Sequence, residues 1–338
     1  MRLLLTFALV VGAGGAAAST GRSMPWLPEV SVVPATDDSA RIVTGRYDGP
    51  EGQRDWRLAV PRGAEARGTL PMLVVLHGCL QDAADIARGS QLDALAKSAG
   101  VLVLYPEQPV TANPRKCWNW FDAAHQARGT GEPALLAALI ESVARTHGAD
   151  PARVHLAGIS AGAAMATLLT VAYPERFASL TSVAGVGWKA APNVGRALAV
   201  MQQGAGSALP DAAALLHAMG SRARAVPVLI VHGGADNVVS VRNADDVVAQ
   251  FVGVHDALRA RAGQGPLTLR EAPPVDAHGH AVRERQWRDP QGTAQVTMLR
   301  VEGLGHAWPY GAKSGSFTDP AGPDLVERLR RLVTGVRR

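Results

Sequence analysis

The sequence has no long hydrophobic run, no internal repeat, no linker and no stripe of like charge. Each of these absences argues against one class of protein. The apolar run that starts at Leu3 is shorter than the ~20 residues needed to cross a bilayer, which argues against a membrane span. The 34 basic and 29 acidic residues are scattered along the chain, so binding to nucleic acid is not expected. Without a repeat or a Ser/Thr/Pro-rich linker, we expect one domain over residues 40–338, preceded by a loosely ordered segment at 19–39.

The first 18 residues have the pattern of a secretory signal peptide. They carry one charge at Arg2, an apolar run from Leu3 and small residues at Ala16, Ala17 and Ala18. A retained membrane anchor is the alternative. No cysteine follows the apolar run, which argues against a lipid anchor. We expect cleavage near Ala18, no stable membrane association of the mature chain, and a secreted or periplasmic location.

Cysteine is scarce, because Cys79 and Cys117 are the two that the sequence contains. In an exported chain they would lie where a disulfide can persist, so a bridge between them is expected. A pair of buried thiols is the alternative, since the geometry that a disulfide requires cannot be deduced from sequence.

From Leu70 onward, short apolar runs alternate with longer segments of helical periodicity. This alternation is typical of an α/β fold with a mostly parallel central sheet and helices on both faces. The predicted strands are Met72–Leu76, Val101–Tyr105, Val154–Ala157, Ser179–Val183, Val228–Val231 and Val296–Val301, with Trp56–Val60 added at an antiparallel edge. The predicted helices are Gln91–Ser98, Pro133–Thr146, Ala161–Ala172, Val241–Val252 and Pro323–Val333. The Ala/Gly-rich stretch from Lys189 to Ala225 has no clear pattern, and a small lid is one interpretation of it.

The pentapeptide Gly158-Ile159-Ser160-Ala161-Gly162 lies between the predicted strand Val154–Ala157 and a strong helical pattern. A serine on a strained strand-to-helix turn, with glycines that allow neighbouring backbone to approach closely, is the nucleophile elbow of the α/β-hydrolase fold. The alternative is an ordinary helix start capped by serine. The strand before and the helix after favour the elbow, so Ser160 is the predicted nucleophile.

A serine hydroxyl needs a base to take its proton and an acid to orient that base, and this fold uses the chain order Ser, acid, His. His306 follows the last predicted strand, where a loop can carry its imidazole back over the elbow. The strand Val228–Val231 runs into Asp236, and loops at the carboxyl ends of strands hold functional groups in open α/β sheets. Ser160, Asp236 and His306 are therefore the predicted triad.

Other histidines and acids fit these two roles less well. Asp245 and Asp246 fall on the helix after Asp236, where solvation or ion pairing is expected. The remaining histidines after the elbow are His278 and His280, in a polar loop before the last strand, and His217, His232 and His255, within or at the ends of earlier elements.

The negative oxygen that develops during ester hydrolysis requires two N–H donors. One is the amide of Ala161, at the start of the helix after Ser160, and the second should come from the turn after the strand Met72–Leu76. That turn reads His77-Gly78-Cys79-Leu80-Gln81, and we assign the second donor to the amide of Cys79.

With these residues assembled, the sequence resembles the polyhydroxybutyrate depolymerase family of esterases, which includes feruloyl and acetylxylan esterase relatives. The segments that carry the resemblance are His77–Gln81, Tyr105–Gln108, Cys117–Phe121, Gly131-Glu132, Ala157–Ala166, Gly305–Pro309 and Asp319–Asp324. The resemblance implies an esterase of the α/β-hydrolase fold with the triad already chosen, oxyanion donors at Cys79 and Ala161, and a bridge between Cys79 and Cys117.

Three tryptophans, Trp118, Trp120 and Trp308, lie within these segments. Aromatic rings are common both in cores and in binding pockets, so each ring either packs in the interior or contacts substrate. We expect Trp120 and Trp308 to line the ester site, with Trp118 as a third candidate.

The sequence thus predicts an exported serine carboxylic-ester hydrolase that acts through an acyl-enzyme on short-chain hydroxyalkanoate esters or oligomers, without metal or organic cofactor. A feruloyl or acetylxylan esterase is the alternative within the same chemistry. A non-catalytic binding module of the same fold is the alternative from another class, against which the complete Ser, Asp and His set argues.

Extracellular polymer depolymerases commonly carry a linker and a separate substrate-binding domain. Neither is recognised here, so weak action on crystalline polymer is expected. No partner other than a small or oligomeric ester is expected, and the sequence does not define an oligomeric state.

Overall fold

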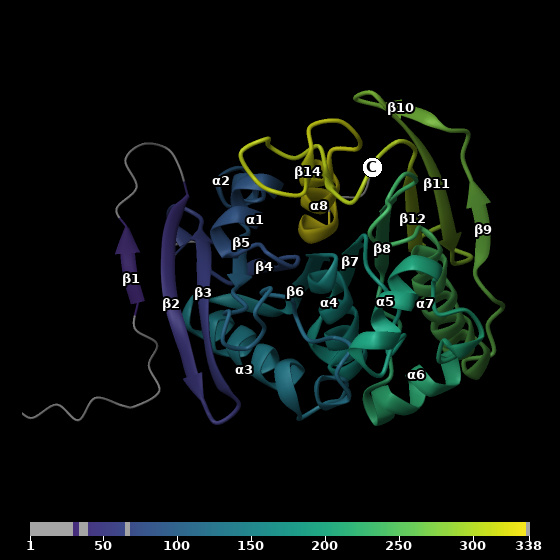
Figure 1. The fold of residues 1–338 in the computed structure, drawn as a ribbon, viewed down its shortest axis with the longest axis horizontal. Helices are drawn as coiled ribbons and strands as arrows, with labels where there is room; N and C mark the ends of the chain where they lie inside the picture. Colours follow the sequence, from purple (N-terminus) through teal and green to yellow (C-terminus); the bar gives the residue numbers. More distant parts are fainter. Residues whose placement is uncertain (1–29, 34–39, 65–67, 336–338) are drawn as a thin grey trace, which may run out of the picture.

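A twelve-stranded sheet forms the centre of the computed structural model, which describes residues 30–33, 40–64 and 68–335 (Figure 1). Its middle strands are parallel. In spatial order they are β5 (Leu102–Pro106), β4 (Leu70–Leu76), β6 (Ala149–Ile159), β7 (Ser179–Val183), β8 (Val228–Gly233) and β12 (Ala294–Val301). All of them present their carboxyl ends at one edge, which is the edge that carries functional groups in open α/β sheets.

Antiparallel strands extend this parallel centre on both sides. Beyond β5 lie β3 (Gly52–Val60), β2 (Arg41–Gly49) and β1 (Val30–Val33). Beyond β12 lies β11 (His280–Arg288), which pairs with both β10 (Val275–Ala277) and β9 (Thr268–Glu271). A separate two-stranded ladder joins β13 (Trp308–Pro309) to β14 (Thr318–Asp319).

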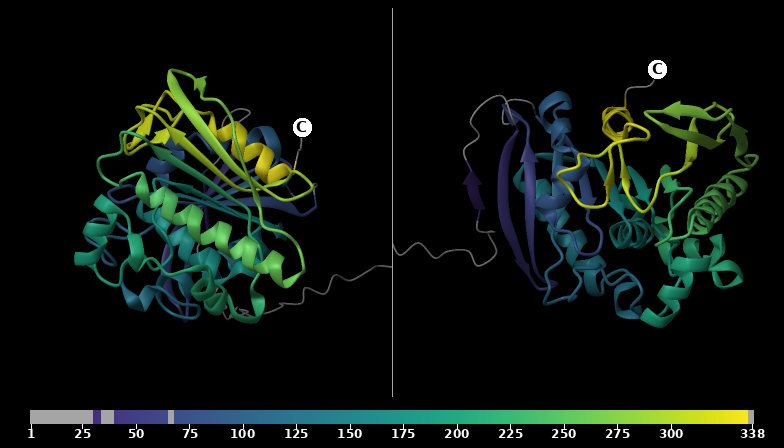
Figure 2. Two further views of the ribbon diagram at one scale, coloured as in Figure 1. Left: turned by 90° about the vertical axis from the view of Figure 1, so that its right-hand side faces the viewer. Right: turned by 45° about the horizontal axis from the view of Figure 1, so that its top comes forward.

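Helices cover both faces of the sheet, as the alternating sequence pattern predicts (Figure 2). One face packs against α1 (Ala83–Ser90), α2 (Asp93–Ala99) and α8 (Leu325–Thr334). The other packs against α3 (Gly131–Thr146), α4 (Ala161–Ala172), α5 (Val194–Gln203), α6 (Ala212–Met219) and α7 (Arg242–Arg261). The two apolar clusters that result account for the continuous hydrophobic sequence of strands such as β4, in which every residue is buried.

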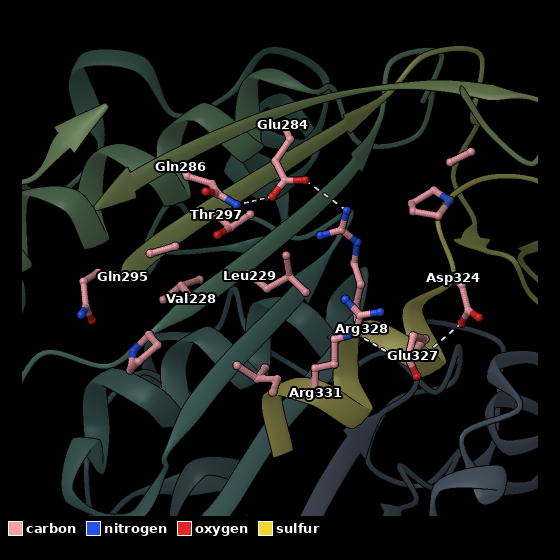
Figure 3. Close-up of a pocket in the computed structure, with 15 residues that line it drawn as sticks. Val228, Leu229, Glu284, Gln286, Gln295, Thr297, Asp324, Glu327, Arg328 and Arg331 are labelled. Carbon is pink, nitrogen blue, oxygen red and sulfur yellow. Dashed lines mark hydrogen bonds and ion pairs between the residues drawn. The ribbon is translucent and has the colours of Figure 1, made fainter. Parts of the chain in front are cut away.

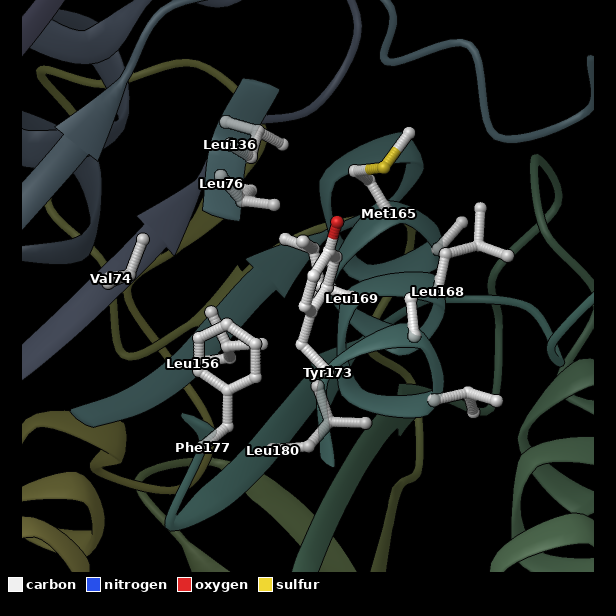
Figure 4. Packing of buried hydrophobic residues seen from close by; sticks show 14 of the residues in the cluster. Val74, Leu76, Leu136, Leu156, Met165, Leu168, Leu169, Tyr173, Phe177 and Leu180 are labelled. Carbon is white, nitrogen blue, oxygen red and sulfur yellow. The ribbon is translucent and has the colours of Figure 1, made fainter. Parts of the chain in front are cut away.

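Helix α4 lies at the centre of the larger cluster, and all twelve of its residues are buried. Figure 4 shows Leu168 and Leu169 of this helix close to Tyr173, Leu156 and Leu180. A helix that is apolar on every side needs neighbours on every side. This packing holds the first turn of α4, directly after Ser160, at a fixed place above the sheet.

The predicted strands and helices are all present with shifted ends. The largest shift is in α7, which continues to Arg261. The antiparallel edge strand is confirmed as β3. His280 is not in a loop but begins β11, because the residues that follow it pair with β12. Strand β1 falls within the segment 19–39, while the predicted signal peptide at 1–18 lies outside the described residues.

The stretch from Lys189 to Ala225 contains the helices α5 and α6, which the sequence pattern did not separate. Asn193 and Asp211 cap them, each accepting a hydrogen bond from a first-turn amide. Among the described residues, no helix has both the length and the apolar character that crossing a membrane requires.

Candidate active site

Ser160 lies on the sharp turn between β6 and α4, with φ 56° and ψ −122°, a conformation that a non-glycine residue rarely adopts. The neighbouring glycines make this turn possible. A Cβ on Gly162 would lie 2.1 Å from the carbonyl oxygen of Leu76, and one on Gly158 would lie 2.5 Å from the backbone of Gly162. The Ser160 amide is held by the carbonyl of Val183 at 2.9 Å. This is the geometry of a nucleophile elbow.

The imidazole of His306 and the carboxylate of Asp236 are directly hydrogen-bonded. The distance from His306 Nδ1 to Asp236 Oδ2 is 2.7 Å, and the Asp236 side chain is completely buried. The other carboxylate oxygen accepts hydrogen bonds from the amides of Val238 at 2.9 Å and Val239 at 2.8 Å. The carboxylate therefore has a fixed orientation, which in turn fixes the tautomer and the plane of the imidazole.

The environment of Asp236 favours its charged form. Burial raises the pKa of its carboxyl, but hydrogen bonds from His232, His306 and the Val239 amide, together with the charge that His306 can carry, hold the pKa well below its usual value. His232 lies 3.5 Å from the same carboxylate oxygen and contacts the carbonyl of Val239 at 2.8 Å. The sequence pattern gives His232 no role in the triad, although its position four residues before Asp236 is a signal that it supports this loop.

The rejected acids and histidines have other partners. Asp245 accepts a hydrogen bond from Arg285 at 2.6 Å, and Asp246 accepts one from the amide of Ala205 at 2.7 Å. His280 lies 3.2 Å from Asp319, far along the chain from the elbow. Among the described residues, the carboxylate that accepts the hydrogen bond from His306 Nδ1 is therefore that of Asp236 and not that of Asp245 or Asp246.

Ser160 and His306 line one cavity of about 580 Å³ at the carboxyl edge of the sheet. No hydrogen bond joins their side chains among the residues described, although His306 Nε2 is left available by the bond that Nδ1 makes. Hydrogen bonds between a nucleophile and its base are often long in the absence of substrate and become shorter when substrate binds.

Three of the four amides from Gly78 to Gln81 in the predicted oxyanion turn donate hydrogen bonds. The Gly78 amide donates to Gln81 Oε1 at 2.9 Å, the Leu80 amide to the Arg115 carbonyl at 2.7 Å, and the Gln81 amide to the Gly78 carbonyl at 3.3 Å. Within the described residues the Cys79 amide donates no hydrogen bond. Ala161 is the first residue of α4, so its amide has no acceptor within the helix. Both amides remain available for an oxyanion.

His77 orients the peptide that carries the Cys79 amide. His77 Nε2 accepts a hydrogen bond from the Gln108 amide at 3.0 Å, so Nδ1 carries the proton and donates to the Gly78 carbonyl at 2.8 Å. The Gly78 carbonyl and the Cys79 N–H belong to one trans peptide, and anchoring the first directs the second to the opposite side. Burial lowers the pKa of His77 to about 4, which keeps the ring neutral. The sequence pattern alone does not indicate this role for His77.

A disulfide and a buried polar network brace the same turn. Cys79 and Cys117 are bridged, with a Cα separation of 4.2 Å, as the sequence predicts. The buried carboxylate of Glu132 accepts hydrogen bonds from the Asn119 amide and side chain, both at 2.7 Å. Gln108 donates to the same carboxylate and to the Cys117 carbonyl. The loop from 113 to 121 is thereby attached to the turn at several points.

The three predicted tryptophans separate into one cavity residue and two interior residues. Trp120 lines the cavity. The prediction that Trp308 lines the ester site is wrong, because its ring is fully buried in the apolar cluster that includes α8 residues and is not among the residues that line the cavity. Trp118 is also fully buried and outside the cavity lining, and its indole N–H donates to the His77 carbonyl at 3.1 Å.

Apolar side chains that sequence reasoning missed surround the mouth of the cavity. Val194 and Leu198 of α5 are 60% and 62% exposed, and the Phe317 ring lies 6.3 Å from the His306 ring. Helix α5 therefore forms a wall of the cavity, consistent with a covering role for part of the stretch 189–225. The exposed apolar residues at this mouth are Leu80, Val194, Leu198, Val238 and Phe317.

A second hollow of about 550 Å³ lies beside α8, against β8, β11 and β12 (Figure 3). Its charged groups are already paired: Arg328 with Glu284 at 3.1 Å, and Arg331 with Glu327 at 2.7 Å. It contains none of the triad residues.

Comparison with known proteins agrees with this geometry. Residues 55–271, more than half of the chain, match the family model described as "Esterase PHB depolymerase". The chain is 30% identical over 260 residues to poly(3-hydroxyalkanoate) depolymerase C of Paucimonas lemoignei, covering 76% of this chain and 59% of the relative. It is 28% identical over 237 residues to acetylxylan esterase A of Talaromyces purpureogenus, covering 65% of this chain and 58% of the relative.

The fold is also similar to that of a solved acetyl xylan esterase from Aspergillus awamori. The TM-score is 0.61 at 21% identity, covering 82% of this chain and 94% of that one. Against the two sequence relatives, by contrast, the chain spans about three fifths of their length. By its family match, the chain belongs to the polyhydroxybutyrate depolymerase family of esterases.

Proposed function

We propose that the protein is a serine carboxylic-ester hydrolase that works through an acyl-enzyme formed on Ser160. The observation that carries this proposal is the buried Asp236–His306 pair, whose imidazole lines the same cavity as the strained elbow serine. Backbone strain at a side chain facing a cavity, next to an oriented imidazole, is the arrangement that nucleophilic catalysis requires.

Each residue has one chemical task in this mechanism. Ser160 Oγ attacks the ester carbonyl while its proton passes to His306 Nε2, and Asp236 stabilises the imidazolium. The amides of Cys79 and Ala161 hold the negative oxygen of the tetrahedral intermediate. Collapse of that intermediate expels the alcohol, which takes the proton from His306. Water then attacks the acyl-enzyme by the same route, releasing the acid and restoring Ser160.

The cavity suits an ester with an aliphatic acyl part. Its walls are mainly apolar, with Trp120, Phe121 and Met201 among the lining residues and no carboxylate among those that the structure describes. We infer that the substrates are short-chain hydroxyalkanoate esters or oligomers. Acetylated or feruloylated plant polysaccharide is the second candidate, favoured by the similarity to acetylxylan esterase A.

We further propose that the mature protein acts outside the cytoplasm. The bridge between Cys79 and Cys117 persists best in an oxidising compartment, and it supports the predicted export signal at residues 1–18.

Substitution of the elbow serine tests the proposed mechanism. Ser160→Ala should abolish turnover of p-nitrophenyl butyrate and labelling by a fluorophosphonate probe, while circular dichroism and melting temperature stay close to wild type. Ser98→Ala is a matched control, because this exposed hydroxyl on α2 only donates to the carbonyl of Ala94. Unchanged labelling of Ser160→Ala would show that another residue is the nucleophile.

A further inference from the structure

The described residues that line the cavity carry positive charge but no negative charge. Of the described residues that line it, Arg115 is the one with a permanent charge, and no Asp or Glu is among them. The rest of the lining is apolar or neutral, apart from the titratable ring of His306. A cation at the mouth of an otherwise apolar cavity attracts substrates that carry an anionic group.

The guanidinium of Arg115 is unpaired among the residues that the structure describes. The Arg115 side chain is exposed and makes no ion pair there. The adjacent cation differs, because Lys116 lies 3.6 Å from Asp82 and 3.6 Å from Glu107. One of two neighbouring charges is thus neutralised within the protein, and the other is left for a ligand.

The backbone of Arg115 is attached to the proposed oxyanion turn. Its carbonyl accepts the Leu80 amide at 2.7 Å, and Cys117, two residues later, is bridged to Cys79. Its own amide donates to Asn113 Oδ1 at 2.9 Å. The backbone of Arg115 is therefore held beside the turn that carries the Cys79 amide, so its side chain starts next to the proposed oxyanion site.

We propose that Arg115 is a specificity-determining residue that binds a free carboxylate of the substrate while the ester lies at Ser160. This inference rests on the proposed function and narrows its substrate class to esters that end in a carboxylate. A hydroxyalkanoate oligomer has such an end, whereas acetylated xylan presents neutral sugar hydroxyls. The planar guanidinium can hold a carboxylate through two parallel hydrogen bonds, which a lysine cannot reproduce.

A pair of matched substrates tests this. The dimer of 3-hydroxybutyrate, as the free acid and as its methyl ester, presents the same internal ester with and without the negative charge. Cleavage of the internal ester is followed by chromatography and yields two molecules of 3-hydroxybutyrate from the acid, but one molecule and its methyl ester from the methylated dimer. Corrected for this stoichiometry, kcat/KM in the wild type should be higher for the acid. Arg115→Gln should lower kcat/KM for the acid about tenfold more than for the methyl ester, mainly through KM, on the scale of a charge-assisted pair. Arg115→Lys should recover part of the loss.

Arg196→Gln is the matched control, because this arginine lies on the cavity helix α5 but outside the cavity lining. It should leave both substrates unaffected. Added salt should reduce the acid preference of the wild type and have little effect on Arg115→Gln. Equal losses on both substrates, or no loss on either, would overturn the role of Arg115. If the wild type cleaves p-nitrophenyl butyrate but neither dimer, ester hydrolysis stands, while the hydroxyalkanoate assignment and this carboxylate site both fall.

Discussion

Removing the bridge between Cys79 and Cys117 should lower both the stability and the activity of the protein. The two cysteines are 38 positions apart. With the chain-entropy expression, closing a loop of that length changes the entropy of the unfolded chain by about 13 cal/mol/K, or about 4 kcal/mol at 25 °C. The entropy of unfolding is about 2.1 cal/mol/K per residue, taken over about 300 ordered residues. Dividing the loss of about 4 kcal/mol by this entropy gives a decrease of about 6 °C in melting temperature.

The effect on catalysis should be smaller than the loss of an oxyanion donor. Removing such a donor outright costs about 2.7–4 kcal/mol of transition-state stabilisation. In the double variant Cys79→Ala/Cys117→Ala the amide at position 79 remains, and His77 still anchors the Gly78 carbonyl. We therefore expect about a tenfold decrease in kcat, a fraction of the full donor effect.

Thermal denaturation and turnover of p-nitrophenyl butyrate, each measured with and without a phosphine reductant, separate these effects. Reductant should shift the wild type towards the double variant and leave the double variant unchanged, which controls for side effects of the reagent. A double variant with the melting temperature and kcat of the wild type would refute the reasoning. It would mean that the Glu132 network alone holds the loop from 113 to 121.

Three further outcomes are expected. Gly162→Ala should prevent soluble expression or abolish esterase activity, because its Cβ would lie 2.1 Å from the Leu76 carbonyl oxygen. Trp120→Ala should lower kcat/KM for p-nitrophenyl esters, and by more for longer acyl chains, because the ring lines the cavity; equal losses at all chain lengths would contradict this. Burial lowers the pKa of His155 to about 4. As the pH falls, this histidine is therefore protonated in the unfolded chain before it is protonated in the folded protein. Stability should then fall by about 3 kcal/mol between pH 6.5 and 4, and urea denaturation of His155→Leu should show a flatter profile there.

The sequence predicts those parts of the site that depend on local pattern. The elbow requires small residues at fixed positions around Ser160, so its signature is contained in five consecutive residues. Asp236 and His306 follow strands with clear apolar runs, and parallel strands deliver their carboxyl ends to one edge. Their pairing at 2.7 Å follows from chain order and strand position together.

Other parts of the site depend on tertiary packing, which local pattern does not contain. Trp120 and Trp308 both lie in segments that carry the family resemblance, yet Trp120 lines the cavity whereas Trp308 packs in the apolar cluster that includes α8 residues. Helix α5 carries an apolar stripe at Val194, Ala197, Leu198 and Met201, but this stripe lines the cavity, and Val194 and Leu198 are exposed. Periodicity can indicate such a helix, but whether its apolar stripe faces the core or a cavity depends on where the helix packs.

The surroundings of the Cys79 amide show how the fold prepares a charge-binding site before substrate arrives. The Gly78 amide, the Gly78 carbonyl and the Leu80 amide are each held by a different residue: Gln81 and His77 of the turn itself, and Arg115 of the neighbouring loop. A peptide fixed on all these sides cannot rotate when negative charge develops, so little reorganisation is needed in the transition state. His77 performs this task only as a neutral ring, because protonation of Nε2 would remove the acceptor that the Gln108 amide uses. The burial that lowers its pKa therefore protects the geometry of the proposed oxyanion site down to about pH 4.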